Sequence, residues 1–428
     1  MSYKNSVENT LAIILAGGSG SRLHALTNWD AKPAIPFGGK FRIIDFSLSN
    51  CVNSGIRKIN ILTQYKSHSL NKHIQRAWNI FRPELGEFVE LIPAQQRLQC
   101  EWYQGTADAI YQNTDIIEEL APEYVLVLAG DHIYKMDYSA MINQHIQQDM
   151  DMTVGCVEMP VSDASEFGVM SIDDRNRITA FREKPVQPDP TPHNQNLALV
   201  SMGIYVFKAD FLYRQLRVDA ARTVSSHDFG KDIIPALVGK CKLGAFPFRD
   251  SETGRPSYWR DVGTIDAFYE ANMELCSVTP ALNLYDPTWP IWTCQEQLPP
   301  AKFVFNNNNR RGTALDSLIS GGCIVSGSKV VSSLLFNNVK VHSYTTIENS
   351  VVLNNAEIGR HCKIRNAVID SDCKIPPNSV IGYDMEEDAH RFHISPKGVV
   401  LVSREMLDKR VLKVAQEFKD QMRQHAVC

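Results

Sequence analysis

The 428-residue sequence lacks the marks of several protein classes. Its ten cysteines contain no Cys-x-x-Cys pair, which argues against a zinc site and against a secreted disulfide framework. No long run of one charge sign occurs and the formal net charge is −4, so a nucleic-acid polymer is not an expected partner. Segment 1–10 is polar, and the apolar run 11–16 is too short for a signal peptide or a membrane helix. We therefore expect a cytoplasmic protein with free thiols and no membrane partner.

The first 276 residues alternate strand and helix patterns. Short apolar runs predict buried parallel strands at 11–15, 59–63 and 124–129. Helical patterns follow them at 44–54, at 67–78 and from 106 to 120, and we expect Ser67 and Thr106 to be N-caps. This alternation predicts an α/β domain over 1–276, with a mostly parallel, Rossmann-like sheet and ligands at the carboxyl ends of its strands.

Prolines interrupt the pattern over 277–313, which we interpret as a linker. Aliphatic residues then recur every 17 positions, with steps of six, five and six between successive members. This spacing predicts a left-handed β-helix over 314–385, in which each short strand places one side chain inward. The tail 386–428 is expected to hold a helix that Ser403 caps. The residues expected to point inward are Ile324, Val341, Ile358 and Ile375, Val330, Ile347, Ile364 and Ile381, and Leu335, Val352 and Ile369.

A glycine-rich loop, 17–22, directly follows the first predicted strand. Glycines let backbone N–H groups approach phosphate oxygens, and a following helix start favours negative charge. Leu23 stands where the dinucleotide-binding fingerprint requires a glycine, so the loop is not of that type. Arg22 adds a guanidinium fork suited to phosphate. The loop therefore predicts a phosphate site.

Carboxylates and a lysine at three further motifs fit the same chemistry. Asp131 follows the strand 124–129, and Asp261 lies in Trp259-Arg260-Asp261-Val262-Gly263. Two such carboxylates suit Mg²⁺, which prefers carboxylate and phosphate oxygens. In Glu183-Lys184-Pro185 the lysine could bind a phosphate and the glutamate could accept hydrogen bonds from sugar hydroxyls. Each motif alone would as readily be a turn or a solvated surface pair.

The order of these motifs resembles that of the sugar-phosphate nucleotidyltransferases, over nearly the whole chain. Within them the chain is similar to the bacterial glucose-1-phosphate adenylyltransferases, which supply glycogen synthesis. The segments that carry this resemblance are Gly17-Gly18-x-Gly20-x-Arg22-Leu23, Ala31-Lys32-Pro33-Ala34, Trp102-Tyr103-x-Gly105-Thr106-Ala107-Asp108, Ala129-Gly130-Asp131-His132 and Ser201-Met202-Gly203-Ile204-Tyr205.

The resemblance implies transfer of the adenylyl group of ATP to α-D-glucose 1-phosphate, with Mg²⁺ as cofactor. It implies catalytic roles for Asp131, Arg22 and Lys32, and metal binding by Asp131 with Asp261. The implied sugar-phosphate residues are Tyr103, Gly168, Glu183, Lys184, Ser201 and Asp228. The implied nucleotide-binding residues are Gly17, Gly18, Gly20, Arg22, Lys32, Gln95 and Gly105.

The resemblance also implies allosteric metabolite effectors and a homotetramer. Trp29 and Asp30 stand where many relatives carry basic residues, so we expect weakened or rearranged effector binding. The regulatory candidates are Lys40, Arg42, Gln64 and Trp102. Two alternatives stay open, namely the same chemistry with UTP or dTTP, and a regulatory subunit without catalytic activity.

Overall fold

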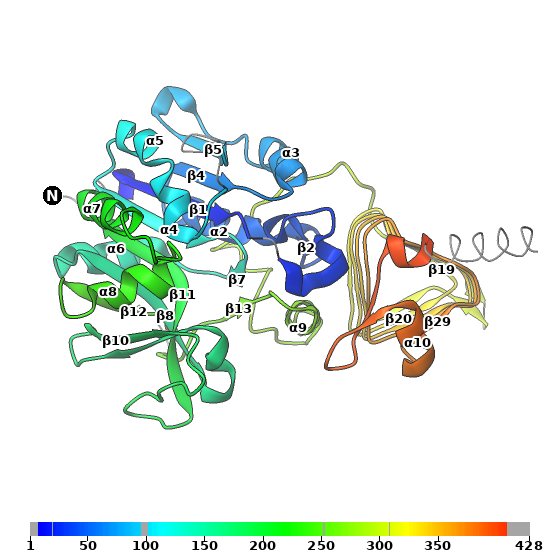
Figure 1. Ribbon diagram of the computed structural model, residues 1–428. Coiled ribbons are helices and arrows are strands. Elements are labelled where there is room, and N and C mark those ends of the chain that lie inside the picture. The colour runs from blue at the N-terminus through cyan, green and yellow to red at the C-terminus, as the bar shows by residue number, and fades with distance from the viewer. Residues whose placement is uncertain (1–6, 19, 96–101, 251–252, 308, 409–428) are drawn as a thin grey trace, which may run out of the picture. The chain divides into compact units, whose positions relative to one another are not determined.

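The computed structural model describes residues 7–18, 20–95, 102–250, 253–307 and 309–408 (Figure 1). Its chain divides into two compact units. Unit 1 comprises 1–19, 43–259 and 286–292, and unit 2 comprises 20–42, 260–285 and 293–428. The glycine-rich loop therefore starts in unit 1 and ends in unit 2.

Unit 1 is built on one nine-stranded sheet. Along the main path the strand order is β10-β9-β11-β6-β1-β4-β5, while β8 pairs with β11 and with β12. The pairs β6–β1–β4–β5 and β8–β12 are parallel, and β11 runs antiparallel to β6 and β8. The strands are β1 Thr10–Ala16, β4 Lys58–Thr63, β5 Phe88–Pro93, β6 Tyr124–Ala129, β8 Met152–Pro160, β9 Gly168–Ile172, β10 Ile178–Glu183, β11 Leu197–Lys208 and β12 Leu243–Pro247; the short β7, His132–Tyr134, lies outside this sheet.

Helices bury this sheet because its central strands are apolar on both faces. On β1, Leu11 and Ile13 point to one face and Ala12 and Ile14 to the other, and all four are fully buried. The first face shares an apolar cluster with α4, α5, α7 and α8. The helices of unit 1 are α2 Ile43–Asn53, α3 Ser67–Ala77, η3 Pro83–Leu85, α4 Thr106–Tyr111, α5 Thr114–Glu119, α6 Tyr138–Gln147, η4 Val161–Glu166, α7 Ala209–Ala220, η5 Phe229–Ile233 and α8 Ile234–Leu237.

The predicted strands and helices of unit 1 are present, but two predicted N-caps are wrong. Ser67 is the first residue of α3 and Lys66, with φ 44°, precedes it as the cap. Thr106 is likewise the first residue of α4, and its hydroxyl bonds to another segment instead of to the helix. The single helix expected from 106 to 120 is two helices, because the chain leaves α4 at Gln112 and Asn113.

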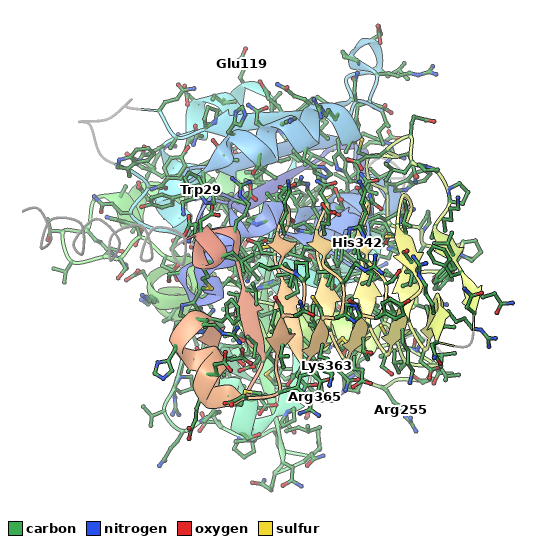
Figure 2. All side chains as sticks on the ribbon, turned by 90° about the vertical axis from the view of Figure 1, so that its right-hand side faces the viewer. Trp29, Glu119, Arg255, His342, Lys363 and Arg365 are labelled. Carbon is green, nitrogen blue, oxygen red and sulfur yellow. The ribbon has the colours of Figure 1, made fainter. Side chains whose placement is uncertain are left out.

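Unit 2 contains the predicted left-handed β-helix (Figure 2). Its three sheets stack equivalent strands of successive coils in parallel, and His393–Ile394 adds antiparallel to the edge of one of them. On β26, Lys363 and Arg365 flank the fully buried Ile364, and this alternation fills the interior with aliphatic side chains. The strands in the three sheets are β14 Lys302–Val304, β19 Ile324–Ser326, β22 Lys340–Val341, β25 Glu357–Ile358 and β28 Lys374–Ile375; β17 Thr313–Leu315, β20 Lys329–Val331, β23 Thr346–Glu348, β26 Lys363–Arg365 and β29 Val380–Ile381; and β18 Leu318–Ile319, β21 Leu334–Leu335, β24 Val351–Val352, β27 Ala367–Ile369, β31 Val400–Val402 and β30 His393–Ile394. Coil strands thus lie on both sides of the predicted limits 314–385.

One inward position was predicted wrongly. Ile324 is 37% exposed, and Val325 occupies the interior in its place. The register explains the difference, because Val325 pairs with Val341, one residue fewer than the 17 that separate Val341 from Ile358. The other ten predicted residues are buried.

Segments distant in the sequence complete unit 2. They are η1 Ser21–Thr27, η2 Lys32–Ala34, β2 Pro36–Phe37, β3 Phe41–Arg42, α9 Ile265–Glu274 and α10 Met385–Arg391, with β13 Trp259–Asp261 at the junction of the units. The Asn272 side chain of α9 accepts a hydrogen bond from the Gly38 N–H, and the Tyr269 hydroxyl donates to the carbonyl of Asn349. Gly39 has φ 93°, and a Cβ there would collide with the Ser320 side chain. Segment 20–42 therefore folds with the β-helix.

Two further predictions concern the tail and the thiols. Residues 404–408 are helical, but the Ser403 hydroxyl has no hydrogen-bond partner among the described residues, so the predicted cap is not formed. The rest of the predicted tail helix lies outside the described residues. All cysteines within the described ranges are free, as expected. In the same ranges, every helix is too short or too polar to cross a lipid bilayer.

Candidate active site

The two cations predicted to bind phosphate converge on one carboxylate in unit 2. The Lys32 ammonium lies 2.6 Å from Oδ1 of Asp261, and the Arg22 guanidinium lies 3.6 Å from Oδ2. The Lys32 side chain is only 7% exposed, whereas that of Arg22 is 51% exposed. Gly263 leaves room for this cluster, because a Cβ there would lie 3.0 Å from the Arg22 guanidinium. The sequence motifs at 22, 32 and 261 thus form one charged group.

The glycines of the loop have different surroundings. Gly17 follows β1 and packs against the side chain of Gln64, and nothing lies within 4 Å of the Cβ position at Gly18. Gly20 has φ 63°, and a Cβ there would meet Thr27 at 2.8 Å. A side chain at position 20 would therefore strain the start of η1, while Gly18 leaves the backbone accessible to a ligand. Ser19 lies outside the described residues.

Asp131 lies just after β6 in unit 1, as predicted. Its carboxylate is 34% exposed, and its Oδ1 lies 3.5 Å from Nε2 of His132. Helix α2 fixes this turn, since the Ser47 hydroxyl donates to the carbonyl of Ala129 and the Asn50 amide donates to that of Tyr134. A rigid turn therefore holds a partly exposed carboxylate at the carboxyl end of a central strand.

An aromatic residue whose role the sequence analysis missed, Trp259, packs between His132 and Phe167. The Trp259 ring packs edge-on against His132 and Phe167, with ring centroids 4.9 Å and 5.3 Å away. The Trp259 indole N–H and His132 Nδ1 are buried and have no partner among the described residues. Buried polar groups are rarely left unpaired, so these two are available to a ligand. Trp259 belongs to a motif quoted for Asp261, but nothing in the motif indicated that its indole lies beside His132.

Four of the predicted sugar-phosphate residues gather in unit 1. Glu183 at the end of β10 pairs with Gly168 at the start of β9, and a Cβ on Gly168 would collide with Glu183 and Phe181. Burial raises the pKa of Glu183, Asp228 raises it further, and Lys184 and Lys231 lower it. Burial also raises the pKa of Tyr205; a hydrogen bond with Ser201 opposes this, and Asp228 and Glu183 add to it. Ser201, Glu183 and Asp228 thus all lie close to Tyr205.

The remaining two sugar-phosphate residues border this group. Lys184 has φ 45°, and its N–H donates to the carbonyl of Phe167. The Tyr103 hydroxyl accepts a hydrogen bond from the Asn113 amide, which follows α4. Gly105 precedes α4, and a Cβ there would collide with the carbonyls of Ser226 and His227. The structure therefore places all the predicted sugar-phosphate residues in unit 1.

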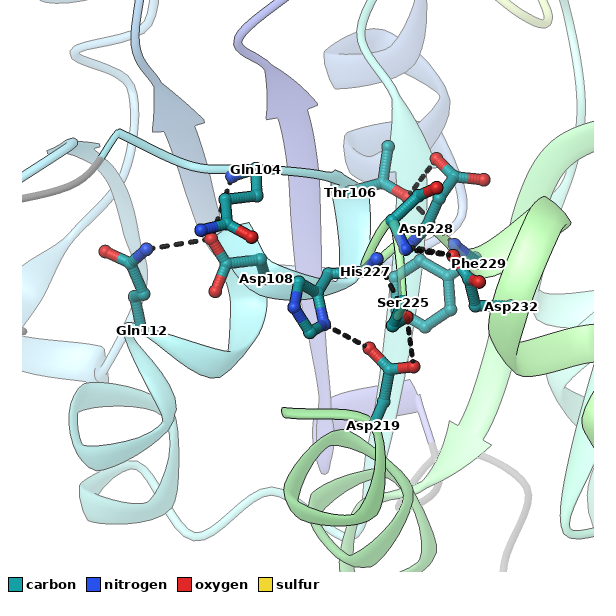
Figure 3. Close-up of polar contacts among 11 residues, drawn as sticks. Gln104, Thr106, Asp108, Gln112, Asp219, Ser225, His227, Asp228, Phe229 and Asp232 are labelled. Atoms are coloured by element: carbon teal, nitrogen blue, oxygen red, sulfur yellow. Dashed lines mark hydrogen bonds and ion pairs between the residues drawn. The ribbon is translucent and has the colours of Figure 1, made fainter. Parts of the chain in front are cut away.

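Asp228 is held by the network shown in Figure 3. Its Oδ2 accepts a hydrogen bond from the Thr106 hydroxyl, and its Oδ1 accepts bonds from the N–H groups of Gly230 and Lys231. Sequence reasoning missed Thr106 in this role, having predicted it to be a helix cap. It also missed the contact between Asp219 and His227, the residue that directly precedes Asp228, because neither residue was part of a predicted site.

The regulatory candidates are divided between the units, with Lys40 and Arg42 in unit 2 and Gln64 and Trp102 in unit 1. Lys40 lies over the ring of Phe41, and the Arg42 guanidinium donates to the carbonyl of Ala34. Trp102 is exposed and stacks on Tyr65, the neighbour of Gln64, with ring centroids 6.0 Å apart. Gln95, predicted to contact the nucleotide, follows the end of β5 at Pro93.

Comparisons with known proteins identify the family of the chain. Residues 11–278 match the model of the nucleotidyl transferase family, and 299–402 match that of the GlmU-like C-terminal hexapeptide family. The chain is 58% identical over 406 residues to a protein of Alkalilimnicola ehrlichii named glucose-1-phosphate adenylyltransferase 2, covering 95% of this chain and 96% of the relative. It is 58% identical to the glucose-1-phosphate adenylyltransferase of Nitrosococcus oceani, covering 94% and 95% of the two chains. It is 59% identical to that of Teredinibacter turnerae, covering 93% and 95%.

Proposed function

Because the chain belongs to the nucleotidyl transferase family, we propose that it transfers the adenylyl group of ATP to α-D-glucose 1-phosphate, giving ADP-glucose and pyrophosphate. The observation that carries this proposal is the identity of 58% to a glucose-1-phosphate adenylyltransferase over 95% of the chain. ADP-glucose is the glucosyl donor for glycogen synthesis, and we place the enzyme in the cytoplasm.

The reaction joins two anions, so the main task of the protein is to offset their repulsion. The phosphate of glucose 1-phosphate attacks the α-phosphorus of ATP, and pyrophosphate leaves in line. We assign Arg22 and Lys32 to the ATP phosphates and Lys184 to the sugar phosphate. Fixed cations lower the barrier by positioning the attack and by stabilising charge in the transition state. Gly17, Gly18, Gly20, Gln95 and Gly105 complete the nucleotide site in this proposal.

The residues present fit Mg²⁺, and we propose that Asp131 and Asp261 hold it. Both offer the carboxylate oxygens that Mg²⁺ prefers, and Asp131 is partly exposed at the end of β6. When bound, the ion neutralises phosphate charge and orients the triphosphate. Lys32 and Arg22 hold the Asp261 carboxylate in one orientation before substrate arrives.

The sugar is assigned to the group around Glu183. Burial raises the pKa of this carboxyl, but the lysines Lys184 and Lys231 oppose the shift. An ionised Glu183 accepts hydrogen bonds only, which suits the hydroxyl groups of glucose. Asp228 accepts bonds in the same way, while Ser201, Tyr103 and the backbone at Gly168 complete the site. A ligand rich in hydroxyl donors therefore matches these acceptors.

An assay of the purified chain tests the proposal. Glucose 1-phosphate and Mg²⁺ are incubated with ATP, UTP or dTTP, and pyrophosphate release is measured. We expect turnover with ATP; turnover confined to UTP or dTTP would replace the nucleotide, and no turnover with any of the three would favour a regulatory subunit.

One substitution tests the metal assignment. We expect Asp131→Asn to abolish turnover, because the ion loses a charged ligand, while the far-UV circular dichroism spectrum stays unchanged. Asp210→Asn is the matched control, since Asp210 is an exposed aspartate in the first turn of α7. Activity of Asp131→Asn near that of the control would remove Asp131 from the mechanism.

Regulation and assembly extend the proposal. We propose a homotetramer, which light scattering would test, and metabolite effectors that act through Lys40, Arg42, Gln64 and Trp102. Asp30 would repel a phosphate, and the Trp29 indole N–H donates a hydrogen bond to the Glu405 carboxylate. We therefore expect weak activation by fructose 1,6-bisphosphate and weak inhibition by AMP, and strong activation would contradict this.

A further inference from the structure

We propose that Asp219 and His227 are positioning residues that set the Asp228 carboxylate for the sugar phosphate. Neither belongs to the residues assigned above to ATP, metal or sugar. The inference rests on the proposed role of Asp228 and adds a mechanism that holds it in place. Figure 3 shows the residues that make up this network.

A buried carboxylate anchors the His227 ring. Oδ2 of Asp219 lies 2.8 Å from Nδ1 of His227, and Asp219 is only 4% exposed. A carboxylate accepts hydrogen bonds, so Nδ1 carries the proton in this contact. The Ser225 hydroxyl donates to the other oxygen of Asp219 at 2.7 Å and accepts a bond from the His227 N–H at 3.0 Å. Asp219 thus holds both ends of the segment 225–227.

This anchor maintains an unfavourable backbone conformation. His227 has φ 52°, which residues other than glycine seldom adopt. Such a conformation persists only where the surroundings impose it, and it tends to occur at functional sites. Here the contacts of the ring with Asp219 and of the N–H with Ser225 impose it.

The strained residue directs its carbonyl at the start of α4. That oxygen accepts hydrogen bonds from the N–H groups of Ala107 at 2.8 Å and Asp108 at 3.3 Å. The first N–H groups of a helix have no partner within the helix, and Gly105 offers no side chain to cap them. The carbonyl of His227, more than 100 residues further along the chain, therefore caps the start of α4.

Helix α4 and the segment 225–227 then fix Asp228 together. Thr106, the first residue of α4, donates to Oδ2 of Asp228 at 2.9 Å and accepts a bond from the Phe229 N–H at 3.0 Å. The opposite oxygen, Oδ1, accepts bonds from two N–H groups of η5. A shift of His227 would move α4 and the main chain of Asp228 at once, so the support that Thr106 gives the carboxylate depends on the Asp219 contact. The bonds from η5 to Oδ1 and from the Asp228 N–H to Asp232 remain.

The arrangement is not a nucleophile with its base. The Ser225 hydroxyl donates to Asp219 and not to the imidazole, and Nδ1 of His227 is engaged by the same carboxylate. The two residues therefore act through Asp228, and their loss should weaken sugar-phosphate binding more than nucleotide binding.

The test measures KM for glucose 1-phosphate, KM for ATP and kcat in His227→Ala, which removes the anchored ring. The control is His361→Ala in the β-helix, where His361 also has a positive φ, 59°, and its ring stacks on Tyr344. We expect KM for glucose 1-phosphate to rise about 10- to 100-fold in His227→Ala, as a displaced binding group would cause. KM for ATP should stay near the wild-type value, and the control should change neither constant.

A double substitution decides whether His227 acts through Asp228. If it does, adding His227→Ala to Asp228→Asn should raise KM for glucose 1-phosphate by less than about 2-fold, because coupled residues are not additive. A full multiplicative effect, or equal rises in both KM values, would overturn the proposal. If His227→Ala does not fold, Ser225→Ala removes the two hydrogen bonds of the Ser225 hydroxyl in the same anchor, to Asp219 and from the His227 N–H, and leaves the contact between Asp219 and His227. It should give a smaller effect of the same kind; no change in KM there would also overturn the proposal.

Failure of the proposed function would look different. A wild-type chain that makes no ADP-glucose would refute the assigned reaction, and calorimetric binding of glucose 1-phosphate to the wild type, His227→Ala and His361→Ala would then decide the inference alone. Weaker binding in His227→Ala than in the other two supports the positioning role, and equal binding in all three refutes it.

Discussion

Replacing Lys32 with methionine should destabilise unit 2 and show how much depends on the pair with Asp261. The two charges are 2.6 Å apart and their side chains are 7% and 15% exposed. Removing one partner of a buried ion pair costs about 3–5 kcal/mol when the other charge stays buried without compensation. The exposed Arg22, 3.6 Å away, compensates the Asp261 charge only in part. For a unit of about 150–250 residues, each kcal/mol lowers the melting temperature by about 2–4 °C. Lys32→Met should therefore lower the melting temperature of unit 2 by roughly 6–20 °C.

Arg22→Met provides the control on the same carboxylate. Arg22 is 51% exposed and 3.6 Å from Asp261, and exposed pairs contribute only about 0–1 kcal/mol. Its loss should lower the melting temperature by at most about 4 °C. Differential scanning calorimetry of four proteins forms a double-mutant cycle that measures the interaction between Lys32 and Asp261. The four are the wild type, Lys32→Met, Asp261→Asn and the double variant.

The cycle should show coupling. The double variant Lys32→Met/Asp261→Asn leaves no buried charge unpaired. Its loss of unfolding free energy should therefore be smaller than the sum of the two single losses by about 1.5–3 kcal/mol, the range for a charged hydrogen bond. Additive losses, or equal effects of Lys32→Met and Arg22→Met, would refute the reasoning. Activity should fall in both single variants, since Lys32 and Asp261 are assigned to ATP and metal.

Three further outcomes follow from the structure. Burial raises the pKa of Asp370 to about 7, Asp30 raises it further and Arg404 lowers it. A carboxyl with a raised pKa stabilises the fold below its unfolded value of 3.8, and this contribution is lost as the pH rises towards 7. Asp370→Asn should therefore match the wild type near pH 4 and exceed it at pH 8 by up to about 4 kcal/mol, at about 1.4 kcal/mol per pKa unit, in denaturant titrations. Gly168→Ala should raise KM for glucose 1-phosphate, because its Cβ would collide with Glu183. An unchanged KM would contradict this and show that β9 and β10 move apart to accept the methyl group. Trp259→Phe should raise the same KM, because the Trp259 indole N–H is buried without a partner among the described residues and is available to a ligand, and an unchanged KM would contradict this.

The sequence predicted the strands and coils well because their signals are local. Buried parallel strands are short apolar runs, and β6 begins and ends where the run 124–129 does. The 17-residue spacing located the interior of the β-helix, but the first coil has one residue fewer in its register, and this put Ile324 on the wrong face. Spacing cannot show where a repeat begins to deviate.

The candidate site was predicted only where motifs carry it. Asp131 stands just after β6, and its place followed from the strand pattern. Glu183 was found through its Glu-Lys-Pro motif alone, and the strand β10 that it ends was not predicted. Thr106 was misjudged because a threonine before a helix pattern usually caps it, whereas here its hydroxyl bonds to Asp228. The contact between Asp219 and His227 depends on how α7 and the following segment fold back, and no local signal encodes that.

Segment 20–42 has a consequence for synthesis on the ribosome. It belongs to the same compact unit as the β-helix, whose last strand ends at Val402, about 360 residues after Arg42. At about 5–20 residues per second, the ribosome needs roughly 20–70 s to make that stretch. During this time Leu23, Ile35 and Phe37, which are buried in the finished protein, belong to a compact unit that is still incomplete. Unit 1, by contrast, has all its residues once 292 of them have been made, so the two units are completed at different times during synthesis.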